Sequence, residues 1–140
     1  MGRITITLPD ITPVSWNKFY RAHWTEQAAV KKEFEKFIWA YTPQAVRNLR
    51  LKNATVEIWA YFKSDKKGSK YCWIDADNLC DKPILDGIKG TIIDDDPHHI
   101  NCVACHSRLD EAHPRTEIII IYEDNNTTPP QVSPKKGIAV

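Results

Sequence analysis

The sequence contains no long apolar run, and this absence excludes a membrane-spanning helix. Its 140 residues are 42% hydrophobic and 26% charged, which is the composition of a globular protein, and no stretch approaches the roughly 20 apolar residues that cross a bilayer. The beginning, MGRITITLPD, has no continuous apolar core behind Arg3, so we expect no secretory signal. These features predict a cytoplasmic protein without membrane association.

Cysteine is scarce, and internal repeats are absent. Four Cys residues without an expected export signal do not predict a disulfide framework. A length of 140 residues suits one domain, because typical domains hold roughly 100–150 residues. We therefore expect a single compact domain over residues 1–123. Residues 124–140 mix Pro, Asn, Thr and Lys without periodicity and are predicted to form a disordered tail.

Net charge is also almost absent, but the two halves of the chain are strongly and oppositely charged. Residues 1–70 carry 13 Lys and Arg against 6 Asp and Glu, whereas residues 71–140 carry 6 against 12. The halves are therefore +7 and −6 within a total of +1. Such halves either pair within the fold or present a phosphate-binding surface beside an acidic metal site. Composition does not choose between these readings.

Alternating apolar residues predict a mixed β-sheet. Strands are expected over residues 3–9, 54–64, 71–77, 99–109 and 116–123. The last of these is almost wholly apolar, so we expect it in the middle of the sheet. Residues 65–70 are predicted to form a hairpin connection.

Helical periodicity adds one long helix and one short helix, which makes the predicted class α+β. The long helix is expected to begin at a Thr25 cap and end near Ala40. Its predicted apolar face consists of Val30, Phe34, Phe37, Ile38 and Tyr41. The short helix is expected over about residues 81–90, because Pro83 fits only a first helical turn, and its predicted buried face is Ile84, Leu85 and Ile88. Residues 9–24 are rich in turn formers and are predicted to be an ordered loop.

The segment of residues 73–100 holds seven Asp residues and no Glu. Asp75 and Asp77 are two residues apart at the end of a predicted strand, so both side chains are expected on one face. Residues 94–96 are all Asp, follow the short helix and can return to the same end of the sheet. Clustered carboxylates oppose one another's ionisation, and a divalent cation removes that cost. Mg²⁺ or Mn²⁺ suits such oxygen donors.

The individual carboxylates differ in what the sequence predicts for them. For Asp75, Asp77 and at least one of the three consecutive Asp residues we favour metal binding. Asp81 and Asp86 are better explained as a helix cap or turn former and as a solvent-facing side chain. Lys82 is the natural cation to stabilise charge building on a phosphate, although a single lysine is more often an ordinary surface residue.

Three motifs in order, DADNL, KPILDGIKG and IIDDDPHHI, resemble the signature of the RusA family of Holliday-junction resolvases. The resemblance covers about residues 3–123 and implies that Asp75, Asp77 and the second Asp of a later pair bind metal. The family's pair follows Gly and three mostly apolar residues, which favours Asp95, with Asp96 as the fallback and Asp94 as a helper. The lysine that the pattern implies is Lys82, one residue later than usual.

The resemblance also implies an activity and partners. It implies a homodimer that binds four-way DNA junctions in recombination and repair and makes paired nicks using Mg²⁺ or Mn²⁺. Asp75, Asp77 and Asp95 would hold the ion while Lys82 supports the phosphate. Aromatic residues near the N-terminus are candidates for base stacking or for core and dimer contacts: Trp16, Phe19 and Tyr20. Candidate DNA contacts are Lys18, Arg21, Lys31, Lys63, Lys66, Lys67 and Lys70.

A competing motif is the C-x-x-C-H pattern of residues 102–106. This pattern is typical of haem attachment, which needs an exported context, or of zinc binding together with Cys72, Cys80 or His99. Free cysteines are also frequently small buried hydrophobes. Two alternative functions therefore stand beside the resolvase: a zinc-stabilised nucleic-acid-binding module without cleavage, and a nuclease for flaps or other branched DNA.

Overall fold

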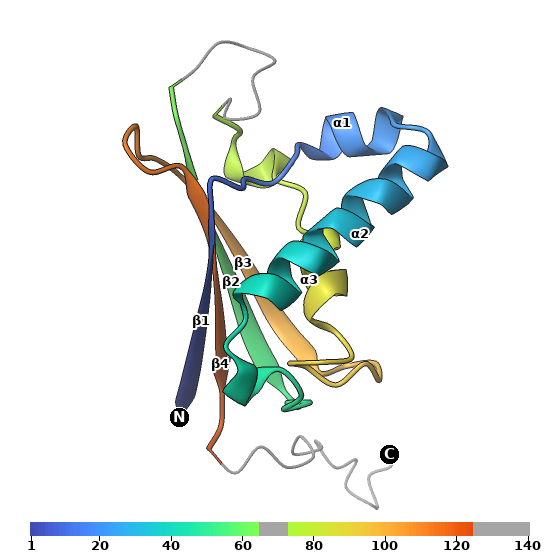
Figure 1. Cartoon of the computed structure of the whole chain (residues 1–140), viewed down its shortest axis with the longest axis vertical. Helices are drawn as coiled ribbons and strands as arrows, with labels where there is room; N and C mark the ends of the chain where they lie inside the picture. Colours follow the sequence, from blue (N-terminus) through green and yellow to red (C-terminus); the bar gives the residue numbers. More distant parts are fainter. Residues whose placement is uncertain (65–72, 125–140) are drawn as a thin grey trace, which may run out of the picture.

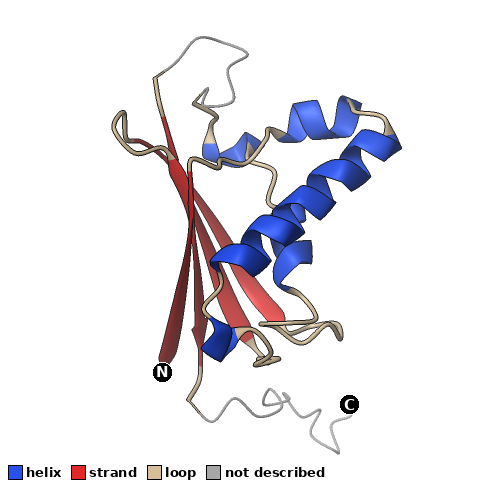
Figure 2. Ribbon diagram, in the orientation of Figure 1, coloured by secondary structure: helices blue, strands red, loops and turns tan. Residues whose placement is uncertain are grey.

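The computed structural model describes residues 1–64 and 73–124, which form a four-stranded sheet with helices on one face (Figures 1 and 2). The strands are β1 (Gly2–Pro9), β2 (Ala54–Phe62), β3 (Ile100–Leu109) and β4 (Arg115–Tyr122). Their order is β1-β4-β2-β3. The β1–β4 and β2–β4 pairs are antiparallel and the β2–β3 pair is parallel, so the predicted mixed sheet is confirmed.

Three α-helices and two short 3₁₀ helices complete the described part of the chain. They are α1 (Trp16–Arg21), α2 (Trp24–Tyr41), η1 (Gln44–Val46), η2 (Ala76–Asn78) and α3 (Lys82–Ile88). Figure 2 shows the helices on one side of the sheet, with its other face open. None of the helices in the described residues has the length and apolar character that a membrane crossing needs.

The core lies between the sheet and the two packed helices α2 and α3. Strand alternation directs every second side chain of β2 inward, and Val56 and Ile58 are fully buried. Phe34 and Ile38 of α2 are 4% and 2% exposed. The inner position of the apolar strand β4 is confirmed by its pairing on both edges, and the predicted α+β class is confirmed as well.

The predicted strand over residues 71–77 is wrong in its described part. Trp73 and Ile74 are extended without strand pairing, and the chain then turns into η2 with Asp75 at the N-cap position. The Asn78 N–H donates to the Asp75 carbonyl at 3.0 Å. Alternation in the sequence suggested a strand, but Asp and Asn close their own backbone turn instead.

The N-terminal loop and the start of the long helix also differ from expectation. Residues 9–24 contain α1, whose cap is Ser15, because its Oγ accepts a hydrogen bond from the Lys18 N–H at 3.1 Å. The N-cap of α2 is His23 rather than Thr25, because the His23 Nδ1 accepts from the Thr25 N–H at 3.2 Å. Tyr41 was predicted on the buried face and is 47% exposed.

The short helix agrees closely with its prediction. It runs over Lys82–Ile88 with Pro83 in the first turn, and Ile84 and Ile88 are fully buried. Leu85 is partly buried against the same core. The predicted hairpin over residues 65–70 and the predicted tail after Asp124 lie outside the described residues.

Candidate metal centre

Backbone hydrogen bonds hold the segment after α3 against the chain that leads into β2. The Arg50 and Leu51 N–H groups donate to the carbonyls of residues 91 and 92 at 2.9 and 2.7 Å, and the Asp94 N–H donates back to Leu51 at 2.9 Å. The Ala54 N–H then donates to the His99 carbonyl at 2.7 Å. The acidic triplet is therefore fixed at the end of the sheet where β2 and β3 begin.

Asp94, Asp96 and His99 form the one group of three candidate metal ligands in the described residues, with ligand atoms that all lie within 4.8 Å of one another. The Asp96 N–H donates to the Asp94 carboxylate at 3.0 Å. That hydrogen bond, with smaller contributions from nearby cations such as Lys52, lowers the pKa of Asp94. Asp94 is therefore ionised at neutral pH and available as a ligand.

His99 supports the fit of this group to a divalent ion. Its Nδ1 is buried and finds no hydrogen-bond partner among the described residues, and a buried polar atom without a partner is costly. A metal ion would satisfy a ring nitrogen of this kind. Two carboxylates and one imidazole suit Mn²⁺ or another first-row metal, whereas Mg²⁺ prefers oxygen alone. The acid pattern had suggested carboxylates only, and the signal for His99 was its position three residues after Asp96.

Asp95, the favoured third ligand from the sequence, is not part of this group. It is exposed, and its Cβ is 3.9 Å from the point where a Cβ on Gly90 would lie. Gly90 has φ 84°, a left-handed conformation that favours glycine. Within the triplet, Asp94 and Asp96 therefore lie together, and Asp95 lies apart from their group.

Asp75 and Asp77 lie at the opposite end of β3. The Trp73 Nε1–H donates to the Ser107 hydroxyl at 2.9 Å, and that hydroxyl donates to the Ile74 carbonyl. Ser107 is seven residues along β3 from Ile100, or about 23 Å at 3.3 Å per residue. Figure 1 shows η2 (yellow-green) near the upper end of the sheet and the loop after α3 near its lower end.

The expectation that all these carboxylates return to one end of the sheet is therefore wrong for a single chain. Asp75 and Asp77 are both exposed, and neither belongs to a group of three ligands within the described residues. The physical reason is α3, whose axis and following turn carry the chain away from η2. Metal binding by the set that the resemblance implies, Asp75, Asp77 and Asp95, stays a prediction.

Lys82 lies between the two ends, on the first turn of α3. Its Nζ is 3.4 Å from Asp86 Oδ1, and the Lys31 Nζ is 3.6 Å from Asp86 Oδ2. Asp86 is thus paired with two lysines. Lys82 itself is 48% exposed and accessible to a ligand on the surface.

The cysteines do not form a zinc site in the described residues. Strand alternation places Cys105 on the helix-covered face of β3, while Cys102 and His106 project from the open face. His106 instead stacks on Trp59 with ring centroids 3.7 Å apart. Burial raises the pKa of the Cys80 and Cys105 thiols to about 11, so both stay protonated at neutral pH. Cys72 lies outside the described residues.

The Asp81 carboxylate lies beside the Cys105 thiol. The Cys105 Sγ is 4.0 Å from Asp81 Oδ2, and burial raises the pKa of Asp81. Asp81 precedes α3 but makes no side-chain cap. It is therefore a partly buried residue next to the buried Cys80 and the partly buried Cys105, and it belongs to no group of three candidate ligands in the described part of the chain.

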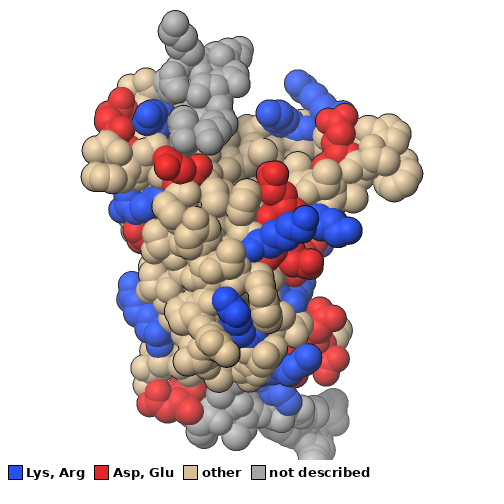
Figure 3. Space-filling model, in the orientation of Figure 1, with Lys and Arg blue, Asp and Glu red and all other residues tan. Residues whose placement is uncertain are grey.

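The candidate DNA contacts are spread over several elements. Lys18 and Arg21 are exposed on α1, Lys31 is on α2, and Lys63 follows β2. Lys66, Lys67 and Lys70 lie outside the described residues. On the face drawn in Figure 3, Lys and Arg side chains are interspersed with Asp and Glu rather than gathered in one patch. On this face, side chains of opposite charge are thus mixed.

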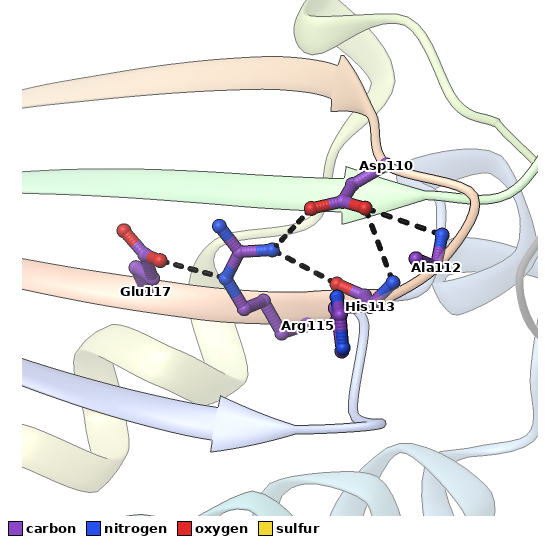
Figure 4. Close-up of polar contacts among 5 residues, drawn as sticks. All are labelled: Asp110, Ala112, His113, Arg115 and Glu117. Atoms are coloured by element: carbon purple, nitrogen blue, oxygen red, sulfur yellow. Dashed lines mark hydrogen bonds and ion pairs between the residues drawn. The ribbon is translucent and has the colours of Figure 1, made fainter.

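An ion-pair network closes the turn between β3 and β4, close to the end of the sheet that holds Asp75 (Figure 4). Arg115 donates to Asp110 at 2.8 Å and to Glu117 at 2.7 Å. Asp110 also accepts from the N–H groups of Ala112 and His113 at 3.2 and 3.1 Å. The hydrogen bond from Arg115, followed by that from His113, lowers the pKa of Asp110. This end of the sheet is therefore fixed by side chains.

A family model described as endodeoxyribonuclease RusA matches residues 10–121 of the 140. The chain belongs to the RusA family. The resemblance carried by the Asp-rich motifs is confirmed, and the match supplies the general activity of RusA proteins, which are endonucleases that resolve Holliday junctions and depend on a metal. Membership in the RusA family also implies binding of branched DNA. No curated protein matches the chain.

Proposed function

We propose that this chain is a divalent-metal-dependent endonuclease that resolves four-way DNA junctions by paired phosphodiester cleavage. The single observation that carries the proposal is the family match over residues 10–121, which spans both acidic motifs. The grouping of Asp94, Asp96 and His99 supports it independently, because these side chains fit a divalent ion. The proposed working state is a homodimer, since paired cuts need two sites.

The proposed metal is Mg²⁺ or Mn²⁺, with Asp94, Asp96 and His99 as proposed ligands where β3 begins. From the family resemblance, Asp75, Asp77 and Asp95 are also proposed as metal-binding carboxylates. When bound, such an ion neutralises a phosphate oxygen and activates water. Asp94 keeps its charge through the Asp96 N–H and holds the loop in a binding conformation. The carboxylates of Asp75 and Asp77 are exposed and therefore accessible to a metal ion from solvent.

Lys82 is proposed to stabilise the negative charge that builds on the scissile phosphate. Its ion pair with Asp86 is exposed and 3.4 Å long, and exposed pairs are weak, at roughly 0–1 kcal/mol. Lys82 can therefore exchange Asp86 for a phosphate oxygen. Phosphate binding beyond the site is assigned to the lysines and arginine named above, with Lys18 and Arg21 on α1 exposed for it.

The test incubates the purified protein with a synthetic four-way junction, a flap and a linear duplex, each with Mg²⁺, Mn²⁺ or EDTA. We expect paired nicks in the junction, no cuts in the duplex and no cuts in EDTA. Cutting of the flap at the same rate as the junction would redirect the assignment to branched DNA in general. Tight junction binding without cutting under any metal would overturn the nuclease assignment in favour of a binding module.

A further inference from the structure

Helix α1 is held against η2, the short 3₁₀ helix that carries Asp77. The Cys80 N–H donates to the Val14 carbonyl at 2.9 Å, just before α1 begins. The Asn17 N–H, in the first turn of α1, donates to the side-chain oxygen of Asn78 at 3.3 Å. Asn78 directly follows Asp77 in the sequence. The first turn of α1 therefore lies beside the segment that carries one of the carboxylates proposed for the metal site.

The last turn of α1 is held by α2. The side-chain amide of Gln27 donates to the carbonyls of Phe19 and Ala22 at 2.9 and 3.3 Å. Phe19 is 6% exposed. Because hydrogen bonds hold both ends of α1 and a buried ring anchors its middle, the side chains on its outer surface have a fixed place relative to η2. Figure 1 shows α1 at the same end of the molecule as η2.

Two aromatic side chains of α1 stack on each other at its surface. Trp16 and Tyr20 are four residues apart, which places them on one side of the helix. Their ring centroids are 5.0 Å apart and their planes meet at 23°. Tyr20 is 71% exposed, so its ring is covered by Trp16 on one side and open to solvent on the other. Of the three aromatic residues predicted for base stacking or for core contacts, Phe19 thus belongs to the core, whereas Trp16 and Tyr20 form a stacked pair at the surface.

The charged side chains on α1 are both positive. The helix contains Lys18 and Arg21, which are exposed, and no acidic residue. An exposed aromatic ring next to cations is the arrangement that proteins use to bind single-stranded nucleic acid, because a base stacks on the ring while the cations contact the backbone phosphates. The stacked pair and its two cations therefore fit a nucleotide better than an apolar protein segment.

We propose that Trp16 and Tyr20 form a base-stacking site for a nucleobase that leaves the stack at the branch point of the DNA. Lys18 and Arg21 contact the phosphates beside that base. Unstacking a base costs least where the base is already unpaired or poorly stacked. A branch point offers such bases and a linear duplex does not, so the site favours branched DNA over duplex. The inference rests on the proposed function for its DNA substrate, but it concerns binding, which is measured without cleavage.

The first test is photocrosslinking of the protein to a four-way junction that carries 5-iodouracil in place of thymine at the branch point. Light couples this base to an aromatic ring that is stacked on it. EDTA is present throughout, so that no cleavage occurs. We expect the crosslinked peptide, identified by mass spectrometry, to contain residues 16–20. A linear duplex with the same base should give no such crosslink.

Two results of the crosslinking would overturn the proposal. The first is a crosslink confined to another segment, such as that of Trp73, which is 52% exposed. The second is equal crosslinking of junction and duplex at residues 16–20, because the site would then not respond to branching.

The second test compares the affinities of substituted proteins for junction and for duplex, again in EDTA. Tyr20→Ala should weaken junction binding by about 10-fold, as expected for the loss of one base–aromatic stack, and should change duplex binding by less than about 2-fold. Tyr20→Phe, which keeps the ring, should bind the junction as the wild type does. Lys18→Ala removes a phosphate contact and should weaken junction and duplex binding alike. The control Tyr41→Ala removes a 47% exposed aromatic side chain at the other end of α2 and should change neither affinity.

The outcomes separate the stacking site from the proposed function. Equal loss of junction and duplex affinity in Tyr20→Ala would overturn the stacking site. So would wild-type junction affinity together with a lower mass in sedimentation, which would make the ring pair a contact between copies of the chain. A wild-type protein that gives the expected crosslinks but cuts no junction with any metal would refute the proposed function and leave the stacking site standing. Paired nicking without a crosslink at residues 16–20 would refute the stacking site alone.

Discussion

The two ends of β3 lie beside two acidic groups that differ in their surroundings. At the Ile100 end, backbone hydrogen bonds fix Asp94, and a buried imidazole nitrogen of His99 lies beside it. At the Ser107 end, Asp75 and Asp77 are exposed on a short 3₁₀ turn that side chains hold in place. The first end resembles an organised ligand group, and the second is a pair of solvated carboxylates. The comparison indicates that three candidate ligands are brought together only at the Ile100 end, among the described residues.

The largest expected effect comes from removing a ligand at the organised end. Asp96→Asn should weaken Mn²⁺ binding and junction cleavage by at least about 100-fold, since even residues that only support metal ligands contribute roughly 10–100-fold. Glu33→Gln, which neutralises an exposed carboxylate on α2, is the matched control. Calorimetry and a gel assay of nicking measure the two quantities. Unchanged Mn²⁺ affinity in Asp96→Asn would contradict the assignment of this end.

The core that separates the two ends can be weakened directly. Ile88 is fully buried at the end of α3, so Ile88→Ala should lower the free energy of unfolding by about 2–5 kcal/mol. Leu49→Ala, at a 42% exposed position, should have a far smaller effect. Urea denaturation measures both, and equal losses would show that α3 does not fix the separation.

Lys82 lies between the two ends of β3, and its substitution tests its proposed role at the phosphate. Lys82→Ala should lower the turnover rate on junctions by about 100-fold, as loss of one transition-state donor does. Its stability should change by less than about 1 kcal/mol, because its ion pair is exposed. Lys31→Ala removes the other partner of Asp86 and should weaken junction binding without a comparable loss of turnover. Equal turnover in both variants would exclude the role proposed for Lys82.

A ligand role for His99 predicts a preference for Mn²⁺ over Mg²⁺ at the Ile100 end of β3. His99→Asn removes the nitrogen donor, so the preference for Mn²⁺ over Mg²⁺ should fall by about 10-fold while Mg²⁺ binding changes little, as expected from the preference of Mg²⁺ for oxygen. Competition titrations measure this ratio. His98→Asn, on the adjacent exposed residue, is the control, and an effect of the same size there would contradict a ligand role for His99.

The smallest expected effect concerns the turn that closes the Ser107 end. Asp110 has a lowered folded-state pKa because Arg115 donates to it, so it stabilises the fold above its unfolded pKa of about 3.9. That contribution is lost as the pH falls through the lower folded pKa. Asp110→Asn should therefore be less stable than wild type at pH 7, and the difference should shrink as the pH falls through the folded-state pKa of Asp110. Thermal melts across this range measure it, and a constant difference would contradict the assignment.

Much of the fold could be predicted from local pattern. The alternation of RITITLP and ATVEIWAYF and the position of Pro83 determine two strands and the start of α3, because side-chain direction and the missing proline N–H are local properties. The segment of residues 73–77 could not be predicted in this way. Its alternation is that of a strand, but it lies beside β3 through the side chains of Trp73 and Ser107, and such a contact depends on the folded sheet.

The candidate site, like the fold, could be predicted only in part from the sequence. The sequence indicated acidic residues for metal binding, and the structure brings Asp94 and Asp96 together with His99. Which members of the triplet converge depends on the folded loop, in which the Asp96 N–H donates to the Asp94 carboxylate. The separation of the two acidic groups, which lie at the ends of a span of β3 about 23 Å long, depends on how α3 packs. Both are tertiary properties that spacing along the chain does not contain.

The most direct test of the central claim is a calorimetric titration of Mn²⁺ into the wild-type protein and the Asp77→Asn variant. Within one chain, Asp77 lies far from the group of Asp94, Asp96 and His99. If the Asp77 carboxylate takes part in metal binding, as proposed from the family resemblance, the Mn²⁺ affinity of the wild type falls in Asp77→Asn. Wild-type affinity and stoichiometry in the variant would contradict a ligand role for Asp77.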